Sequence, residues 1–233
     1  MSDVLCGFLS DMEALGELNH REAAGWLLAD GWNVCGAGDW ATVWRSPDGG
    51  LAARVSPFEP AYEVFVRLCR ALPGNPLLPR VELDSPLEGG GRITVMEFLT
   101  PAGGDRAAEV WRRWDAAEPG DPVAAVRAEA ERLHAEAAEA VPYWGGLDRN
   151  PGNVMATPSG ETRLVDLFYA EGLVIYGELL KDPDRVLASF PPERRRYLAE
   201  IGAVVRQSTS EEIAALRKVA SHSLRSTEPS LTR

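Results

Sequence analysis

The chain has 233 residues, 45% of them hydrophobic, and a formal net charge of -11. This length and apolar content suffice for one sizeable core or for two lobes that share an interface, and the negative charge argues against nucleic-acid or anionic-membrane binding. No run of about 18 apolar residues occurs, and the first residues lack the basic segment of a signal peptide. We therefore expect a globular, cytoplasmic protein. Three cysteines without CxxC spacing indicate neither a disulfide framework nor a zinc site.

Residues 1–30 form the first expected unit, a helical extension of the N-terminus. A helix is predicted over residues 11–30 because apolar side chains recur there at helical spacing. The side chains of this apolar face are Leu15, Leu18, Ala23, Trp26 and Leu27.

Residues 31–100 form the second expected unit, an antiparallel sheet with one helix. Short runs rich in Val, Trp and Thr are separated by glycines, and SPDGG at 46–50 predicts a turn between two strands. A helix is expected from about Tyr62 to Cys69, before the PGNP turn at 73–76. Two further strands are expected near 80–83 and 92–99.

Residues 101–233 form the third expected unit, which is mainly helical. Helices are expected near 107–117 and over 122–140, the second opened by Asp121 as N-cap and by a proline at the first helical position. A single β-hairpin, with NVMAT and TRLVDLF on either side of a turn at 158–160, interrupts the helices. We expect fraying after about Ser221. The whole order predicts a two-lobed α+β fold with a cleft between its lobes.

A glycine-containing loop, GAGDWATV, begins at Gly36. Gly36 and Gly38 would let backbone N–H groups approach a phosphate closely. The same letters fit the dinucleotide pattern GxGxxA, but that pattern requires a helix directly afterwards, whereas a strand and a turn follow here. A phosphate-covering loop and a purely structural β-turn both remain open. Trp40 at the tip would cover phosphates, contact an acceptor or simply be exposed.

Arg54 lies in the next strand, LAARV, at the position where kinases have a phosphate-pairing lysine in the pattern V-A-I-K. A guanidinium group can also neutralise phosphates and pair with a carboxylate. We expect Glu63 on the following helix to be that partner, with Glu59 as a competitor because it is closer in sequence. An exposed strand arginine is the alternative.

The most informative pattern is LDRNPGNVM followed by LVDLF. Phosphoryl transfer needs a carboxylate that accepts the proton of the attacking hydroxyl, and oxygen ligands for Mg²⁺. Asp148 lies in a loop, Asn153 follows five residues later, and Asp166 is expected to end the returning strand of the hairpin. The hairpin would bring Asn153 and Asp166 together around one metal ion, with Asp148 on the substrate side. An Asx-turn with strand caps is the purely structural alternative.

From Gly36 to Phe168 the chain resembles the aminoglycoside phosphotransferase group of the protein-kinase-like fold, whose catalytic loop typically reads HGDLHPGN. The resemblance implies that Asp148 is the catalytic aspartate and that Asn153 and Asp166 bind Mg²⁺. It also implies ATP as the phosphoryl donor, with the backbone of a hinge that includes Glu97 and Leu99 contacting adenine.

The chain departs from that family pattern at four places: Gly146 replaces the histidine, Ala41 the third loop glycine and Arg54 the lysine, and no glycine follows DLF. The expected function is ATP- and Mg²⁺-dependent transfer of the γ-phosphoryl group to a hydroxyl of a small molecule, an aminoglycoside-like compound or another antibiotic or metabolite. Alternatives are a kinase of Ser or Thr in a peptide, as in natural-product biosynthesis, and a nucleotide-binding pseudokinase with a regulatory role. Neither nucleic acid nor a membrane is an expected partner, and the oligomeric state is left open.

Overall fold

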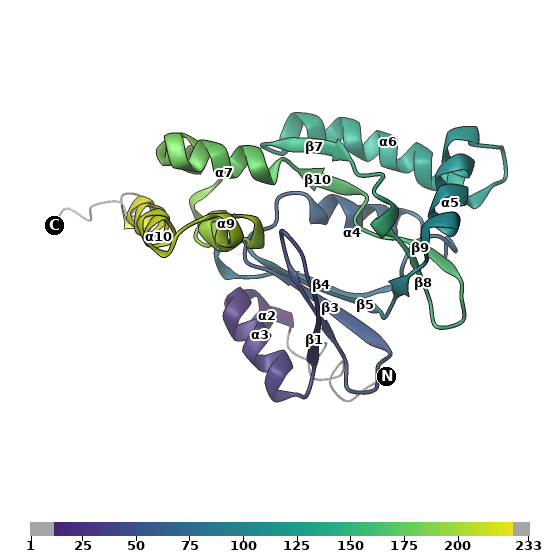
Figure 1. Ribbon diagram of the computed structural model, residues 1–233, viewed down its shortest axis with the longest axis horizontal. Helices are drawn as coiled ribbons and strands as arrows, with labels where there is room; N and C mark the ends of the chain where they lie inside the picture. The colour runs from purple at the N-terminus through teal and green to yellow at the C-terminus, as the bar shows by residue number, and fades with distance from the viewer. Residues whose placement is uncertain (1–11, 226–233) are drawn as a thin grey trace.

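The computed structural model describes residues 12–225, with side chains for residues 15–218, as a mixed α+β protein (Figure 1). An antiparallel sheet lies on one side of the molecule, and most of the helices lie on the other side. None of the helices within the described range is long and apolar enough to cross a membrane.

A five-stranded antiparallel sheet contains the predicted strands of the second unit. Its strands are β1 (Asn33–Ala37), β2 (Thr42–Arg45), β3 (Leu51–Ser56), β4 (Val81–Pro86) and β5 (Arg92–Glu97), in the order β1-β2-β3-β5-β4. The predicted turn at 46–50 is confirmed. Asp48 accepts hydrogen bonds from the Gly50 N–H and the Ser46 hydroxyl, and Gly49 has the positive φ that glycine tolerates.

The N-terminal segment forms two helices, so the prediction of one helix over 11–30 is wrong; residue 11 lies outside the described range. The helices are α2 (Met12–Glu17) and α3 (His20–Ala29). Asn19 separates them because its side chain accepts from the N–H groups of Arg21 and Glu22, and the Glu22 side chain bonds back to the Asn19 N–H. This capping box starts a new helix.

Helices α2 and α3 cover one face of the sheet (Figure 1). Leu15 and Leu27 pack there against alternate strand residues such as Ala53 and Val55. Trp26 was expected on this apolar face but is 43% exposed, so that prediction is wrong. Because strand side chains alternate between the two faces, Arg54 points to the face opposite these helices, where the site lies.

Helix α4 (Tyr62–Ala71) lies on that opposite face and confirms the predicted helix before the PGNP turn (Figure 1). It packs against α6 (Pro122–Ala140) and joins the largest hydrophobic cluster of the described residues, which also contains Trp111 and Trp114 of α5 (Gly104–Ala116). The predicted cap of α6 is confirmed, since the Asp121 side chain accepts from the Val123 N–H.

The second half contains more β-structure than the single predicted hairpin. The hairpin is present as β8 (Val154–Ala156) and β9 (Thr162–Leu164), and β6 (Thr100–Pro101) extends it. A second ladder joins β7 (Trp144–Leu147) to β10 (Phe168–Ala170). The prediction of one isolated hairpin is therefore wrong: these strands are only two to four residues long, and a glycine-containing run such as WGGL carries no alternation that would reveal a strand.

Within the described residues, the C-terminal region consists of four helices around a separate apolar cluster. They are α7 (Gly172–Lys181), α8 (Pro183–Ala188), α9 (Gly202–Gln207) and α10 (Ser210–Arg225), with short 3₁₀ segments at Pro192–Arg194 and Leu198–Glu200. Further 3₁₀ segments lie at Glu88–Gly90 and Pro151–Asn153. Residues 221–225, expected to fray, belong to α10, and residues 226–233 lie outside the described range.

Candidate active site

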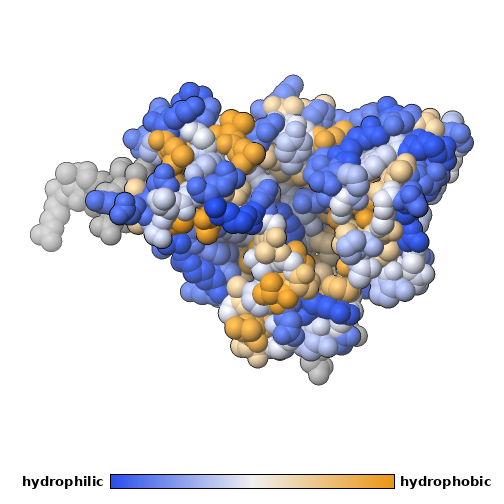
Figure 2. Space-filling model, viewed as in Figure 1, coloured by the Kyte–Doolittle hydropathy of each residue, from blue (hydrophilic) through white to orange (hydrophobic). Residues whose placement is uncertain are grey.

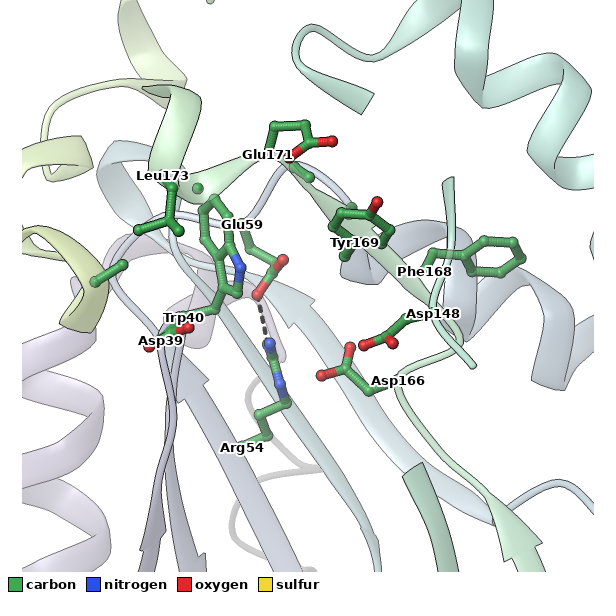
Figure 3. A pocket seen from close by; sticks show the side chains of 14 residues that line it. Asp39, Trp40, Arg54, Glu59, Asp148, Asp166, Phe168, Tyr169, Glu171 and Leu173 are labelled. Carbon is green, nitrogen blue, oxygen red and sulfur yellow. Dashed lines mark hydrogen bonds and ion pairs between the residues drawn. The ribbon is translucent and has the colours of Figure 1, made fainter. Parts of the chain in front are cut away.

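A cavity of about 440 Å³ lies where the sheet and the helical region meet (Figure 3). Two of the three residues with predicted catalytic roles, Asp148 and Asp166, line it together with Arg54. Its other walls come from the β1–β2 loop, the link between β3 and α4, the segment from β10 into α7, and α9. These segments are far apart in sequence.

Asp148 follows β7 in a tightly bonded loop. Its N–H donates to the Leu167 carbonyl over 2.8 Å, and its Oδ1 accepts from the Asn150 N–H over 3.0 Å. The Asn150 side chain in turn accepts from the Gly152 N–H over 2.8 Å. These successive Asx turns shape the 148–153 segment from its own sequence, and the carboxylate of Asp148 faces the cavity.

Asn153 connects the two aspartates. Its Nδ2 donates to the backbone carbonyls of Asp148, over 3.2 Å, and Asp166, over 3.0 Å. Two carbonyl acceptors fix the nitrogen on that side, so the amide oxygen is turned away from them and can accept or bind a cation. The Asn153 carbonyl also accepts from the Val165 N–H over 2.8 Å, which ties the two hairpin segments together.

Asp166 lies two residues beyond the end of β9, so the expectation that it ends the strand is wrong. It has a φ of 50°, an uncommon left-handed conformation for a residue other than glycine. The Asn153 amide stabilises this conformation by binding the Asp166 carbonyl. Strained backbone of this kind concentrates at functional sites, and here it turns the carboxylate toward Asp148 (Figure 3).

Burial raises the pKa of Asp166 to about 6. The Arg54 guanidinium opposes this effect, whereas the charges of Glu59 and Asp148 add to it. A carboxyl group with a raised pKa next to a second carboxylate favours a cation in the cavity, because a cation would stabilise the ionised form.

Arg54 forms a buried ion pair with Glu59 over 2.5 Å, and the side chains of both residues are almost inaccessible to water. The guanidinium carbon lies 3.8 Å from the centre of the Tyr62 ring. Burial alone would lower the pKa of Arg54, but Glu59, Asp166 and Tyr62 together raise it, so the side chain stays charged.

The predicted pairing of Arg54 with Glu63 is therefore wrong. Glu59 lies in the link directly after β3, and its other oxygen accepts from the Tyr62 N–H over 3.2 Å, at the start of α4. Glu63 lies on the helix itself and pairs instead with Arg92 over 2.9 Å and with Arg194 over 3.5 Å. It does not line the cavity.

The donors at this site fit Mg²⁺ as a shared ligand of protein and phosphates. Carboxylate and amide oxygens are hard donors, and Mg²⁺ usually takes one or two carboxylates from a protein and fills its remaining positions with water and phosphate oxygens. Asp166 lines the cavity and could supply a carboxylate; Asn153 does not line it, and its amide oxygen is the residue's remaining donor for a cation. Among the described residues there is no group of three or more His, Cys, Asp or Glu side chains that could hold a metal by themselves, so an all-protein cage does not fit.

The β1–β2 loop does join two antiparallel strands, as predicted, but its glycines do not line the cavity. Gly36 belongs to β1, and the Gly38 N–H donates to the Ala41 carbonyl over 2.8 Å, so this N–H already has a partner. Asp39 and Trp40 at the tip of the loop line the cavity instead.

The loop tip is attached to the C-terminal helices. The Asp39 carbonyl accepts from the Ala203 N–H over 2.9 Å, and Arg206 bonds to the Gly38 carbonyl over 3.1 Å and pairs with the Asp39 carboxylate. The Trp40 indole packs on Gly172, where an added Cβ would lie 3.0 Å from the ring. We call this set of contacts the loop anchor.

The expected hinge lies outside the cavity. The Glu97 side chain binds the Arg163 guanidinium over 2.9 Å and the Arg80 N–H over 3.0 Å, so it is structural. The Glu97 N–H donates to the Arg80 carbonyl, and the Phe98 N–H donates to the Gly50 carbonyl. Leu99, the last residue of the expected hinge, is buried and does not line the cavity either.

Reasoning from the sequence missed several cavity residues or their contacts. Tyr169 and Leu173 were not singled out because an isolated aromatic or leucine near a helix start has no distinctive pattern, and Arg206 reaches the loop across 167 residues of sequence. No protein-family model matches the chain, and no curated protein matches its sequence.

Proposed function

We propose that this protein is an ATP- and Mg²⁺-dependent phosphotransferase that moves the γ-phosphoryl group to a hydroxyl of a small molecule. One observation carries the proposal: Asp148 and Asp166 face one cavity beside a buried arginine, and Asn153 bonds to the backbone of both aspartates. Phosphoryl transfer requires such a proton acceptor, such oxygen ligands and such a cation near the phosphates.

Each residue has a distinct role in this reaction. Asp148 orients the acceptor hydroxyl and takes its proton as the alcohol oxygen bonds to the γ-phosphorus and the bond to the bridging oxygen breaks, leaving ADP. Asp166 and Asn153 hold Mg²⁺, and Arg54 lies beside the phosphates. ATP would supply the transferable group, and Mg²⁺ would offset the negative charge that develops on it.

The two-lobed arrangement of protein-kinase-like enzymes is part of this proposal. The five-stranded antiparallel sheet with α4 would form the nucleotide lobe, and the helical region with the β8–β9 hairpin would form the other lobe. The segment that follows β5 and leads into α5 would be the hinge between these lobes, beside adenine. The tip of the β1–β2 loop, which lines the cavity with Asp39 and Trp40, would lie beside the bound substrates.

Thermal unfolding with and without ATP and Mg²⁺ tests the proposal. At about 100 times the dissociation constant, a ligand specific for the folded state adds about 2.7 kcal/mol of stability. We expect a shift for the wild type and for Asp148→Asn, and little or no shift for Asp166→Ala. Absence of a wild-type shift would refute nucleotide binding.

Turnover separates an enzyme from a nucleotide-binding regulator. Mass-spectrometric screening of a metabolite extract with ATP should reveal a product that has gained one phosphoryl group. We expect this product with the wild type and not with Asp148→Asn, which keeps the shape of the side chain but removes the proton acceptor. Nucleotide binding without any product would favour the pseudokinase alternative.

A further inference from the structure

Beyond the catalytic aspartates, the cavity extends into a region that the proposed phosphoryl chemistry does not use. Its walls are Trp40 from the loop tip, Tyr169 from β10, Glu171 and Leu173 at the start of α7, and Ala203 from α9. In Figure 3, Trp40, Leu173 and Glu171 lie together on the side of the cavity away from Asp148 and Asp166. Because Asp148 must reach the acceptor hydroxyl, this region is where the rest of the acceptor would lie.

Two of the acidic side chains of the cavity are paired with arginines. The lining residues of the cavity include five carboxylates and one guanidinium. Asp39 pairs with Arg206, and Glu59 pairs with Arg54. The charges of Asp148 and Asp166 belong to the proposed catalytic and metal-binding roles.

Glu171 is the remaining acid of this cavity. It is the N-cap residue of α7, but its side chain makes no capping hydrogen bond. Among the described residues no ion pair involves its carboxylate, so it provides one uncompensated negative charge at the rim of the cavity. One such charge suits one cationic group on a ligand.

The walls around Glu171 are apolar or aromatic. Leu173 is 64% exposed and Val174 next to it is 44% exposed, although both are large apolar residues. Apolar side chains gather on the surface over α7 (Figure 2). Exposed apolar surface next to a cavity often marks a binding site, and the aromatic faces of Trp40 and Tyr169 can also attract a cation.

We propose that the acceptor is an alcohol with an apolar or aromatic body and a single basic amine. Trp40, Tyr169 and Leu173 contact the body, and Glu171 pairs with the ammonium group. A sugar with several amines would carry several positive charges, and Glu171 can pair with only one of them. Its polar body would also leave the apolar side chain of Leu173 uncovered. This inference rests on the proposed phosphotransferase activity and narrows its substrate class.

Matched alcohols test the proposal through kcat/KM for ADP release. Phenylalaninol and phenylpropanol differ only in the amine, as do aminohexanol and hexanol, and kanamycin represents sugars with several amines. In both pairs we expect kcat/KM for the amine to exceed kcat/KM for the neutral alcohol by about tenfold or more, which corresponds to about 1.4 kcal/mol. Glu171→Gln should remove most of this difference, whereas Glu139→Gln, an exposed control on α6, should preserve it.

Leu173→Asp tests the apolar wall separately. It should lower kcat/KM for both members of each pair, and it should raise kcat/KM for kanamycin relative to these alcohols. The proposal is overturned if kanamycin or a neutral serine peptide is the best acceptor in the wild type, if the neutral alcohols equal the amines, or if none of the amines is phosphorylated. In each of these cases a thermal shift with ATP and Mg²⁺ leaves the nucleotide-binding part of the proposed function intact; without that shift, the proposed function itself fails.

Discussion

The two sides of the cavity are held in different ways. On the helical side, Asp148, Asn153 and Asp166 are positioned by hydrogen bonds to backbone groups within about twenty residues of one another. On the sheet side, Arg54 and the β1–β2 loop are held by charged partners, and one of these, Arg206, lies in the last quarter of the chain. The turn bonds of the first side are recognisable in sequence, whereas on the second side the bond from Arg206 to the loop depends on tertiary structure.

Removing one half of the Arg54–Glu59 pair should give the largest change in stability. Arg54→Ala leaves the Glu59 carboxylate, which is 3% exposed, without its cation. Such a loss typically costs about 3–5 kcal/mol. Urea unfolding should show this decrease. The double variant Arg54→Met, Glu59→Leu should recover most of it, because it removes both charges; failure to recover would mean that the pair is not what stabilises this link.

Asn153→Ala should have the next largest effect. The substitution leaves the carbonyls of Asp148 and Asp166 without their amide donor and should lower the free energy of unfolding by about 1–3 kcal/mol. Asn150→Ala, which removes one exposed turn bond to Gly152, is the matched control and should cost less. Equal losses in the two variants would contradict the connecting role of Asn153.

Asp166→Asn should stabilise the ligand-free protein at neutral and alkaline pH. The folded state holds the pKa of Asp166 at about 6, above its ordinary value. The stabilisation from its neutral form is therefore complete at low pH and is lost as the pH rises through about 6. Asparagine stays neutral, so the variant should exceed the wild type by about 1–2 kcal/mol at about pH 8, with no difference at about pH 4.

Urea unfolding across this pH range measures the effect. Asp115→Asn is the control, because a hydrogen bond from Arg149 lowers the pKa of Asp115, opposite to the shift at Asp166. Removing the Asp115 carboxylate should therefore not stabilise the protein as the pH rises. A wild-type protein that is as stable as Asp166→Asn at alkaline pH would show that the Asp166 carboxyl group has no raised pKa.

Arg206→Ala should give the smallest change in stability. Both members of its pair with Asp39 are about half or more exposed, so the loss should stay below about 1 kcal/mol. Its local effect should be larger: amide hydrogen exchange in residues 38–42 should accelerate, and Trp40 fluorescence should shift as the indole leaves Gly172. Arg112→Ala, which removes a surface pair with Glu109, should leave the loop unchanged.

The helical side shows what sequence alone could predict. Turn-forming residues at 148–153 and the hairpin signal at 158–160 indicate their own local structure, so three residues could be assigned to one site. The prediction that Asp166 ends the strand is wrong, since this residue lies beyond β9 in a left-handed conformation. Propensity alone would not predict this conformation for an aspartate, because the amide that stabilises it belongs to Asn153.

The sheet side shows where such prediction fails. Glu63 is predicted as the partner of Arg54 because it lies on the helix that follows β3. In the structure the link after β3 brings Glu59 to Arg54, and Glu63 pairs with Arg92 instead. Gly38 was expected to offer its N–H to a phosphate, and the Ala41 carbonyl occupies it. Both contacts are local in sequence, but they depend on the exact path of a turn and of an interstrand link, which periodicity and spacing do not encode.

The loop anchor also affects how the site is completed during synthesis. The loop tip at Asp39 leaves the ribosome early, but Ala203 and Arg206 follow more than 160 residues later. Gly172, on which Trp40 packs, precedes α9 in the chain, so this contact can form before the contacts of the loop tip to α9. The cavity therefore gains its last wall only once α9 has been synthesised, and a product truncated before α9 would lack the Ala203 and Arg206 contacts that hold the loop tip.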